Sequence, residues 1–462
     1  MYFDSHAHLQ REFYGDEVEE VVARAFAAGV TGIVASGSGA DPAEMVEAVD
    51  LAARHAWIRA AVGVHPHEAA KATGASFEAV DRLLAGERVV ALGEVGLDFH
   101  YDLSPRDVQM DVFRRQVATA TRAGKPLVIH CREAHDACVE VLAAAARPER
   151  PGVVHCFTAD LPTARRYLDL GFMVSIPGVV TFRNAGPLAD AVRAIPLDRM
   201  LVETDAPFLA PVPMRGRPNE PAFVRHTVEA IARLRGMSAD DVARVTALNA
   251  RRLFGIADPE ADAPRLAYAI RDSLYVNMTN RCTLRCTFCA KSRDYHVKGH
   301  NLRIARDPPV EALRAAIEAE DPSRFREVVF CGYGEPLLRL DDVKALAAWL
   351  KGRGARVRVN TDGLASLVHG RDVARELAGL VDAVSVSLNA PDAATYARLC
   401  PSRHGEDAFA AVLAFLRRAR EVIPEVTATV VALPGLDVEA CRRLAEDDLG
   451  VGFRARQFDD LG

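Results

Sequence analysis

The feature that most restricts how this chain can fold is a regular alternation of short apolar segments with longer amphipathic ones. Segments rich in β-branched residues predict strands, and the stretches rich in Ala, Leu, Arg and Glu between them predict helices. Residues 1–256 contain eight predicted strands, the number and size expected of a TIM-type (β/α)8 barrel. These strands are expected at Tyr2–Leu9, Val30–Ser36, Ile58–His65, Val89–Leu97, Leu127–Cys131, Val153–Phe157, Phe172–Pro177 and Leu201–Thr204.

A second series of the same kind follows a short polar segment. Residues 257–264 carry two prolines and no hydrophobic period, which is typical of a linker. Residues 265–462 then alternate again, and six predicted strands with helices between them indicate a partial (β/α)6 barrel. These strands are expected at Leu274–Met278, Glu327–Cys331, Arg356–Asn360, Ala383–Leu388, Thr427–Leu433 and Phe453–Phe458. The chain is therefore expected to contain two domains joined by the linker.

Composition and charge narrow the class of protein. The 462 residues are 50% hydrophobic and carry 57 basic and 63 acidic side chains, for a net charge of −6. These values exclude a disordered chain, and the charge excludes a protein that coats nucleic acid by neutralising phosphates. They do not exclude a nuclease that meets phosphate with metal ions. Because no apolar run approaches the roughly 18 residues of a membrane span and no signal peptide begins the chain, a cytoplasmic protein without membrane association is expected.

Histidines and carboxylates stand at the expected ends of several strands in residues 1–256. His6 and His8 lie two positions apart in the first predicted strand, so both side chains face the same side of it. In a βα barrel the strand ends meet on one face, where catalytic residues gather. Each histidine alone could be a hydrogen-bonded core residue, but the whole set suits two divalent cations. The further candidate ligands lie at the ends of strands four, five, six and eight, and they are Glu94, His130, His155 and Asp205.

The motifs around these residues resemble those of the TatD family of metal-dependent hydrolases, over residues 1–256. They are Ser5–His8, Gly63–His67, Gly93–Asp98, Ile129–Glu133, His155–Phe157, Glu203–Pro207, Arg215-Gly216 and Asn219–Pro221. Family members are nucleases, several of which remove nucleotides from DNA ends. The resemblance implies one metal held by His6, His8, Glu94 and Asp205, and a second held by Glu94, His130 and His155.

The implied activity is deoxyribonuclease action on a nucleic-acid strand end. Two metals would activate water and stabilise charge on the phosphodiester, with Glu94 bridging them. Asp205 is the candidate for orienting or deprotonating the water. His65, His67 and Arg215 are candidate phosphate or product contacts, and a structural role for the two histidines stays open. Imidazole-rich ligands favour Zn²⁺, Mn²⁺ or Fe²⁺ over Mg²⁺, although Mg²⁺ could still be the working ion in the cell.

Three of the nine cysteines lie within eight residues, directly after the first predicted strand of the second series. Cys282, Cys286 and Cys289 have the spacing C-x3-C-x2-C. A structural zinc site needs four closed ligands, and no fourth cysteine follows at zinc-ribbon spacing. A disulfide is improbable in the cytoplasm. A [4Fe-4S] cluster held by three thiolates leaves one iron open for a cofactor, which this spacing favours.

This motif, with Phe288 before the last cysteine, resembles that of the radical S-adenosylmethionine (SAM) enzymes, over residues 270–462. The resemblance implies one [4Fe-4S] cluster, cleavage of SAM to a 5′-deoxyadenosyl radical, and an electron donor such as flavodoxin or ferredoxin. Cys331–Pro336 resembles the family's Gly-Gly-Glu-Pro segment, with Tyr333 in place of the first Gly. The implied SAM contacts are Phe288, Gly334, Glu335, Ser387 and Asn389.

The remaining cysteines of this half give no second set of ligands. Cys331, Cys400 and Cys441 are far apart in sequence and share no ligand spacing, so a second cluster is not expected.

The whole chain resembles the TatD-associated radical SAM proteins, which predicts a bifunctional enzyme. One alternative has the first domain hydrolysing a small cyclic amide or ester. Another has the second domain acting as a redox-sensing Fe–S or nucleic-acid-binding module, although a sensor would not need the Gly334-Glu335-Pro336 segment. The substrate of the radical domain is not identified by any motif.

Overall fold

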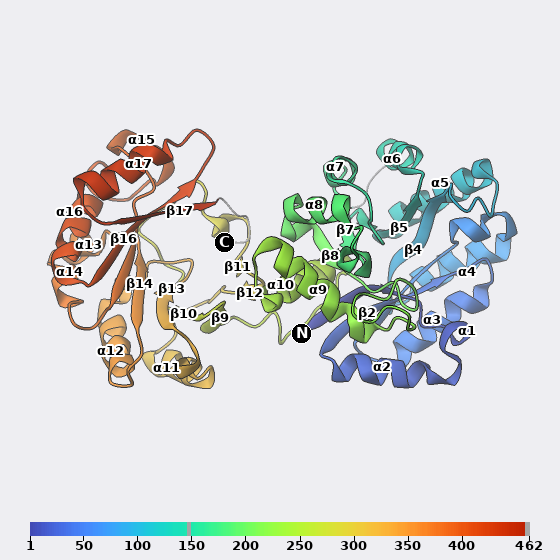
Figure 1. The fold of residues 1–462 in the computed structure, drawn as a ribbon, viewed down its shortest axis with the longest axis horizontal. Helices are drawn as coiled ribbons and strands as arrows, with labels where there is room; N and C mark the ends of the chain where they lie inside the picture. The colour runs from blue at the N-terminus through green and yellow to red at the C-terminus, as the bar shows by residue number, and fades with distance from the viewer. Residues whose placement is uncertain (146–148, 458–462) are drawn as a thin grey trace. The chain divides into compact units, whose positions relative to one another are not determined.

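The computed structural model describes residues 1–145 and 149–457. The chain divides into two compact units, Met1–Asp258 and Pro259–Gly462, which Figure 1 shows as two separate bodies. The predicted strand end at Phe458, and residues 458–462 of the second predicted domain, lie outside the described residues.

The first unit is a nearly closed barrel of eight parallel strands in the order β1 to β8. Its two edge strands meet through a bridge between Ala7 and Ala206, supported by the hydrogen bond from His8 N to Ala206 O at 2.7 Å. The predicted (β/α)8 barrel is thereby confirmed. The strands are β1 (Tyr2–Ala7), β2 (Val30–Ser38), β3 (Ile58–Gly63), β4 (Val89–Asp98), β5 (Leu127–Arg132), β6 (Gly152–Val154), β7 (Met173–Ile176) and β8 (Met200–Val202).

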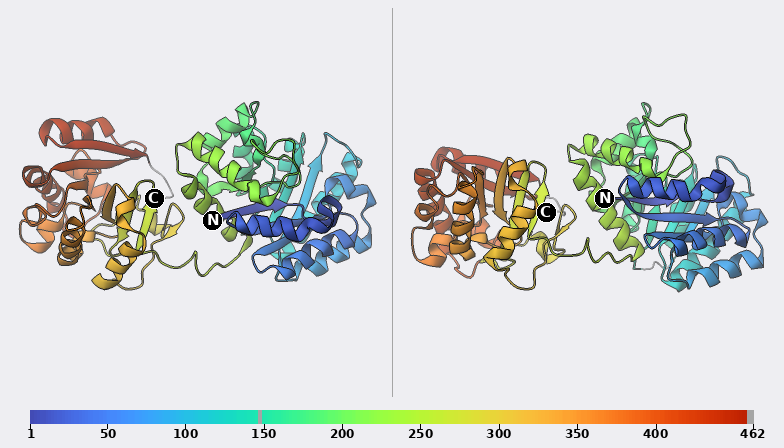
Figure 2. Two further views of the ribbon diagram at one scale, coloured as in Figure 1. Left: turned by 60° about the horizontal axis from the view of Figure 1, so that its bottom comes forward. Right: turned by 90° about the horizontal axis from the view of Figure 1, so that it is seen from below.

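Helices surround this barrel, as Figures 1 and 2 show. Several begin at side-chain caps: Asp160 accepts a hydrogen bond from Thr163 N, and Ser238 accepts one from Asp241 N. The helices are α1 (Arg11–Tyr14), α2 (Val18–Ala27), α3 (Pro42–Arg54), α4 (Gly74–Leu84), α5 (Arg106–Ala123), α6 (His135–Ala144), α7 (Leu161–Asp169), α8 (Gly186–Ala194), α9 (Val224–Arg235) and α10 (Ala239–Phe254). Short 3₁₀ turns are η1 (Gly15–Glu17), η2 (Pro66–Lys71), η3 (Gly178–Thr181), η4 (Leu197–Arg199) and η5 (Pro221–Phe223).

Helix α10 packs on an apolar cluster that belongs to the barrel strands. Leu253 and Phe254 of α10 join a buried group that includes Phe3, Val34 and Val128 from β1, β2 and β5. Phe3 lies near the start of its strand, whereas the histidines and carboxylates lie at the strand ends. The apolar residues therefore fill one end of the barrel, and the polar candidates are left at the other.

The second unit has a seven-stranded sheet in the order β17-β16-β15-β14-β13-β10-β9. Six of these strands are parallel and match the six predicted ones, in agreement with a partial (β/α)6 barrel. The strand β9 is an addition, antiparallel to β10, and a four-residue segment beside the linker gives too short a pattern to predict it. The strands are β9 (Ala267–Ile270), β10 (Ser273–Asn277), β13 (Glu327–Cys331), β14 (Val357–Thr361), β15 (Ala383–Ser387), β16 (Glu425–Ala432) and β17 (Gly452–Gln457).

Helices pack on one face of this sheet. Alternate strand residues such as Val328, Val359 and Val384 share a buried core with helix residues such as Leu346 and Phe415. The helices are α11 (Val310–Ala319), α12 (Leu340–Lys351), α13 (Ala365–His369), α14 (Val373–Glu376), α15 (Ala393–Leu399), α16 (Asp407–Val422) and α17 (Val438–Arg443). Short elements are η6 (Ala290–Ser292), the hairpin β11 (His296–Val297) and β12 (His300–Asn301), η7 (Pro322–Arg324), η8 (Pro336–Arg339) and the π-helical turn η9 (Leu444–Asp448).

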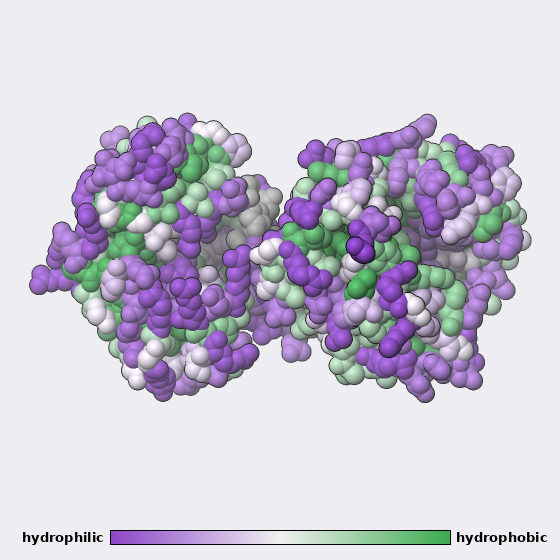
Figure 3. Space-filling model, in the orientation of Figure 1, coloured by the Kyte–Doolittle hydropathy of each residue, from purple (hydrophilic) through white to green (hydrophobic). Residues whose placement is uncertain are grey.

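Figure 3 shows hydrophilic side chains spread over the visible face of each unit. Among residues 1–145 and 149–457, no helix is both long and apolar enough to cross a membrane.

Candidate functional site

Three of the candidate ligands meet at the ends of β1 and β8. The Nε2 atoms of His6 and His8 are 3.1 Å apart, and they lie 3.9 and 3.7 Å from Asp205 Oδ1. His8 follows β1 because this strand ends at Ala7, earlier than the sequence predicts, and Asp205 follows β8. Asp205 has the left-handed backbone conformation, with φ of 57°, which is uncommon for a residue other than glycine and occurs often at functional sites.

Glu94 of β4 lies between these residues and the other two histidines. Its Oε2 is 3.3 and 3.4 Å from the Nε2 atoms of His6 and His8. Its Oε1 is 2.7 Å from both His130 Nδ1 and His155 Nε2. The two oxygens of one carboxylate therefore face two different pairs of imidazoles.

Buried atoms without hydrogen-bond partners test whether cations fit here. His6 and Glu94 are buried, and no hydrogen bond reaches Glu94 Oε2 or His6 Nδ1. Leaving buried polar atoms unpaired is costly unless a ligand satisfies them. His6, His8 and Asp205 offer ligand atoms close enough to hold one ion, and so do His6, Glu94 and His155. The donor set thus fits divalent cations.

The electrostatics around the candidate metal ligands favour positive charge. Burial alone would raise the pKa of Glu94, but the nearby His155 and His65 imidazoles hold it well below its usual range. Burial alone would lower the pKa of His130, but its contacts with Asp98 and Glu94 raise it to about 9. A bound cation would take over this role and displace the imidazole protons.

Two further carboxylates lie beside the histidines, Asp98 with hydrogen bonds to them and Glu203 without one, and the sequence analysis did not single them out. Asp98 Oδ2 lies 3.0 Å from His130 Nε2 and 2.9 Å from His67 Nε2. Glu203 Oε1 lies 3.5 Å from His155 Nδ1. A carboxylate on the far nitrogen of a metal-binding histidine fixes its ring orientation and tautomer. Both acids fall inside the quoted motifs, but strand alternation does not show which nitrogen of a histidine faces the site.

The predicted substrate residues differ in where the structure places them. His65 lies in the pocket, with Nε2 3.2 Å from Glu94 Oε1, and burial lowers its pKa to about 4. His67 lies beside Asp98. Arg215 makes its described contacts elsewhere, because its guanidinium stacks 4.3 Å from the ring of Phe182 and donates to Ala210 O.

Exposed aromatic side chains lie beside the candidate metal ligands. Phe13 and Phe208 are 38% and 47% exposed, and their rings meet edge to face with centroids 5.5 Å apart. Each centroid is about 6 Å from that of His8. Near His67, the exposed Tyr101 lies under the guanidinium of Arg132, at 4.7 Å. Sequence reasoning missed these residues, although Phe208 comes three positions after Asp205.

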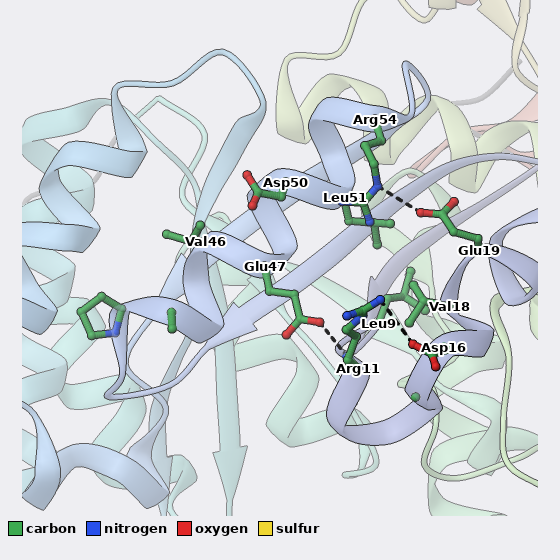
Figure 4. Close-up of a pocket in the computed structure, with 13 residues that line it drawn as sticks. Leu9, Arg11, Asp16, Val18, Glu19, Val46, Glu47, Asp50, Leu51 and Arg54 are labelled. Atoms are coloured by element: carbon green, nitrogen blue, oxygen red, sulfur yellow. Dashed lines mark hydrogen bonds and ion pairs between the residues drawn. The ribbon is translucent and has the colours of Figure 1, made fainter.

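A separate pocket of about 670 Å³ lies between α1, α2 and α3 (Figure 4). Its charged groups pair with one another: Arg11 with Asp16 at 3.3 Å, and Arg54 with Glu19 at 3.0 Å. Glu47 Oε1 accepts a hydrogen bond from Arg11 N. Because none of the candidate metal ligands lines it, this pocket is distinct from the candidate metal site.

In the second unit, the loop with the three cysteines follows β10 and packs against the end of α15. Arg285 N donates to Pro401 O and Thr287 N to Leu399 O, both at 2.9 Å. Cys282, Cys286 and Cys289 are free thiols on this loop, none of them fully buried. Three free thiols at this spacing on one anchored loop fit a cluster that leaves one iron open.

Gly334 and Glu335 lie against the same loop. A Cβ atom on Gly334 would overlap the carbonyl oxygens of Thr279 and Arg281, so only glycine allows this close approach. Glu335 N donates to Arg281 O at 2.8 Å. The buried carboxylate of Glu335 accepts hydrogen bonds from protein groups, among them Leu337 N and Asp362 N, and so holds the segment in place.

The other predicted SAM contacts are Phe288, Ser387 and Asn389. Phe288 is half-buried and packs against the core of the unit. Ser387 ends β15, and Asn389 follows with the left-handed φ of 57°. Asn389 Nδ2 is 3.6 Å from the sulfur of Cys400.

Cys400 lies beside the cysteine loop although it is far from it in sequence. It is fully buried, and its contact with the Cys286 thiol raises the pKa of Cys286. Sequence spacing hides this proximity, because 114 residues separate the two cysteines. Cys331 instead accepts from Asn360, and Cys441 is buried in α17.

Comparison with known proteins agrees with the division of the chain into two domains. The family model "TatD related DNase" matches residues 3–255, and that of the "Radical SAM superfamily" matches residues 276–447. An uncharacterized metal-dependent hydrolase of Bacillus subtilis, YabD, is 42% identical over 256 residues, which are 55% of this chain and 100% of YabD.

Two further relatives match the same half. The 3′-5′ ssDNA/RNA exonuclease TatD of Erwinia tasmaniensis is 38% identical over 262 residues, which cover 55% of this chain and 100% of that protein. The crystal structure of YjjV, a TatD homologue from Escherichia coli, superposes with a TM-score of 0.52 at 31% identity, covering 55% of this chain and 98% of YjjV. Through residues 3–255 the chain belongs to the TatD family of metal-dependent hydrolases, and it continues at residues 276–447 into a radical SAM domain.

Proposed function

We propose that the first domain is a two-metal phosphodiesterase that removes nucleotides from the end of a DNA strand. The observation that carries the proposal is the position of Glu94, whose two oxygens face two separate pairs of imidazoles. This is the arrangement of a carboxylate shared by two cations. The exonuclease activity named for the relative from Erwinia tasmaniensis supports the same reaction class.

Each candidate residue has a role in this proposal. One cation is held by His6, His8, Asp205 and Glu94, and the other by Glu94, His130 and His155. Two divalent cations supply an activated water and stabilise charge on the phosphodiester. Asp205, at the edge of the pocket, orients the attacking water and accepts its proton. His65 and His67 contact the phosphate, and Asp98 keeps His130 and His67 in position.

The exposed aromatic residues favour a nucleic acid over a small cyclic amide or ester. Bases of single strands stack on aromatic side chains, at about 1–3 kcal/mol per base. Phe13 and Phe208 lie beside His8, with ring centroids 6.1 and 5.9 Å from its imidazole, so a base next to the proposed metal site could stack on them. A small cyclic amide or ester has no base to stack on such a pair.

A comparison of two substrates tests this function. Mononucleotide release from a single-stranded oligonucleotide should require added metal and stop with a chelator. Phe208→Ala should slow this release about tenfold while hydrolysis of bis(p-nitrophenyl) phosphate stays near wild type. Phe26→Ala serves as the control, because Phe26 is exposed on α2 beside Trp57. Hydrolysis of small esters without any action on DNA or RNA ends would contradict the proposal and favour the small-substrate alternative.

For the second domain, we propose a radical SAM enzyme with one [4Fe-4S] cluster held by Cys282, Cys286 and Cys289. The cofactors supply one-electron cleavage of SAM, and a flavodoxin or ferredoxin supplies the electron. The chain binds and orients SAM through the Gly334-Glu335 segment and through Phe288, Ser387 and Asn389. The close approach of Gly334 to the loop backbone supports this assignment.

Anaerobic reconstitution tests the second domain. About four irons per chain, a change in the spectrum of the reduced cluster on adding SAM, and release of 5′-deoxyadenosine with dithionite are expected. Four irons without a SAM-dependent change would instead favour a redox-sensing or nucleic-acid-binding module.

A further inference from the structure

The sheet of the second domain has one face that its helices do not cover. Alternation places Val328, Val359 and Val384 on the helix side, so their neighbours in sequence point the other way. Those neighbours are mostly polar, and among the described residues they include Tyr275, Glu327, Arg358, Asn360, Ser385, Thr427 and Thr429. We call this set the open face. Polar side chains that converge on an uncovered face can orient a polar ligand.

Two arginines of β17 extend the open face at its edge. Phe453 packs against the core on the helix side, so Arg454 and Arg456 point to the open face. Arg454 pairs in register with Thr429 of β16, and Arg456 with Val431. The charges of Arg358 and Glu327 also act on the guanidinium of Arg454, as expected for side chains on the same face of the sheet.

Positive charge exceeds negative charge on this face. Arg358 is 11% exposed and gives two hydrogen bonds to Glu327, at 3.1 and 2.8 Å, so those two charges offset each other. Among the residues the structure describes, no ion pair engages Arg454 or Arg456. Partial burial lowers the pKa of Arg454, and repulsion from Arg358 and Arg456 lowers it further. Like charges gathered on one face are unfavourable until an anion joins them.

We propose that Arg454 and Arg456 bind the phosphate or carboxylate group of an anionic substrate of the radical domain. The proposal rests on the proposed radical SAM function of this domain and adds the chemical class of its substrate. Arginine presents a planar fork of donors that matches both groups in bidentate fashion. Arg358, Asn360 and Tyr275 then offer further polar contacts toward the start of the strands.

The position of the two arginines suits a substrate held close to SAM. Thr429, the register partner of Arg454, pairs in turn with Ser387, which is a proposed SAM contact. Arg454 and Arg456 therefore stand at the same level of the sheet as the proposed cofactor site, near the carboxyl ends of the strands. Open α/β sheets bind their ligands at that end.

Arginine modification tests the proposal in the full-length protein with its cluster reconstituted. Phenylglyoxal modifies free guanidinium groups, and peptide mass spectrometry reports each arginine separately. Inorganic phosphate, a nucleoside 5′-monophosphate and succinate are the probes. A phosphate or carboxylate probe is expected to protect Arg454 and Arg456. Which probe protects at the lower concentration then distinguishes a phosphorylated substrate from a carboxylic acid.

A matched pair of variants gives the second measurement. In Arg454→Gln, the concentration of probe that protects Arg456 should rise about tenfold, since one charge-assisted contact is lost. Arg417→Gln should leave it unchanged, because Arg417 is exposed on α16, on the helix side. Iron content and the SAM-induced spectral change verify that each variant is folded and binds its cofactor.

Three results would overturn the proposal. Equal protection of Arg417 would mean non-specific screening, and protection by none of the probes would mean that the face binds no such anion. Protection by SAM alone would mean that the arginines hold the cofactor's own carboxylate. In each case, a spectral change on adding SAM shows that the proposed radical SAM function still stands. If the wild-type protein shows no such change, the proposed radical SAM function itself is contradicted.

Discussion

Glu94 is the residue on which the proposed two-metal site depends most. Because its two oxygens face different pairs of histidines, Glu94→Ala should release both cations, whereas His6→Ala should release mainly one. Nucleotide release should fall by more than about a hundredfold in Glu94→Ala, as the cations supply most of the transition-state stabilisation. Metal content by mass spectrometry and an oligonucleotide assay measure the two effects. Full metal content and activity in Glu94→Ala would show that the carboxylate is not shared.

Asp98 is expected to act on the metal through His130. Asp98→Asn should weaken metal binding by about ten- to hundredfold, because it removes the carboxylate that orients the imidazole. Isothermal titration with Mn²⁺ or Zn²⁺ measures the affinity. Asp102→Asn is the control, since Asp102 lies in the following loop, partly exposed, and pairs only with Arg106 among described contacts. An affinity equal to wild type in Asp98→Asn would limit Asp98 to a structural role.

Cys400 contacts the cysteine loop but is not expected to be a ligand of the cluster. Cys286→Ala should lose the cluster, since three thiolates are needed and no spare one follows at the right spacing. Cys400→Ala should keep about four irons per chain, although Cys400 contacts Cys286. Iron and sulfide analysis after anaerobic reconstitution decides between the two. Loss of iron in Cys400→Ala together with retention in Cys286→Ala would mean that the ligands have been assigned wrongly.

At the scale of secondary-structure elements, the turn after β13 carries the proposed contact with SAM. Gly334→Ala would push a methyl group against the carbonyl oxygens of Thr279 and Arg281, so the turn or the loop must shift. The variant should keep its iron but lose most of the SAM-induced spectral change. Gly352→Ala is the control, because a Cβ there meets only ordinary contacts at the end of α12. An unchanged response in Gly334→Ala would exclude this turn from SAM binding.

The sequence predicted the elements well where hydrophobic period determined them. Continuous β-branched runs fixed all eight strands of the barrel and the six parallel strands of the second sheet to within a few residues. The short β9 and the β11–β12 hairpin have no such period, because neighbouring chain segments rather than their own pattern stabilise them. Strand ends were placed too late at β6 and β8, where the chain bends so that His155 and Asp205 can turn inward.

The candidate site was predictable only where a metal-binding type of residue stood at the predicted end of a strand. Histidines and a glutamate at strand ends are rare enough to stand out, and the structure brings His6, His8, Glu94, His130, His155 and Asp205 together. Asp98 and Cys400 could not be found in this way. An orienting carboxylate differs from an ordinary one only in its hydrogen bonds, and Cys400 reaches the loop through the path of α15.

For the molecule as a whole, the two proposed sites lie in separate compact units. Replacing Cys282, Cys286 and Cys289 together by alanine should therefore leave nucleotide release within about twofold of wild type, because none of the candidate metal ligands lies in the second unit. The oligonucleotide assay measures this, and iron analysis confirms that the cluster is gone. A large fall in nucleotide release would show that the hydrolase depends on the cluster domain.

The apolar packing of α10 on the barrel strands determines where the two halves can be parted. α10 is the last helix before the linker, and its Leu253 and Phe254 lie in the buried cluster that fills one end of the barrel. A protease that cleaves within residues 257–264 would release a barrel in which this buried apolar cluster is intact. A truncation before Ala239 would leave Phe3, Val34 and Val128 facing water, and the fragment would be prone to aggregate. Fusions that exchange the partner of this barrel are therefore expected to leave it folded only when they join after Ile256, which also packs on this cluster.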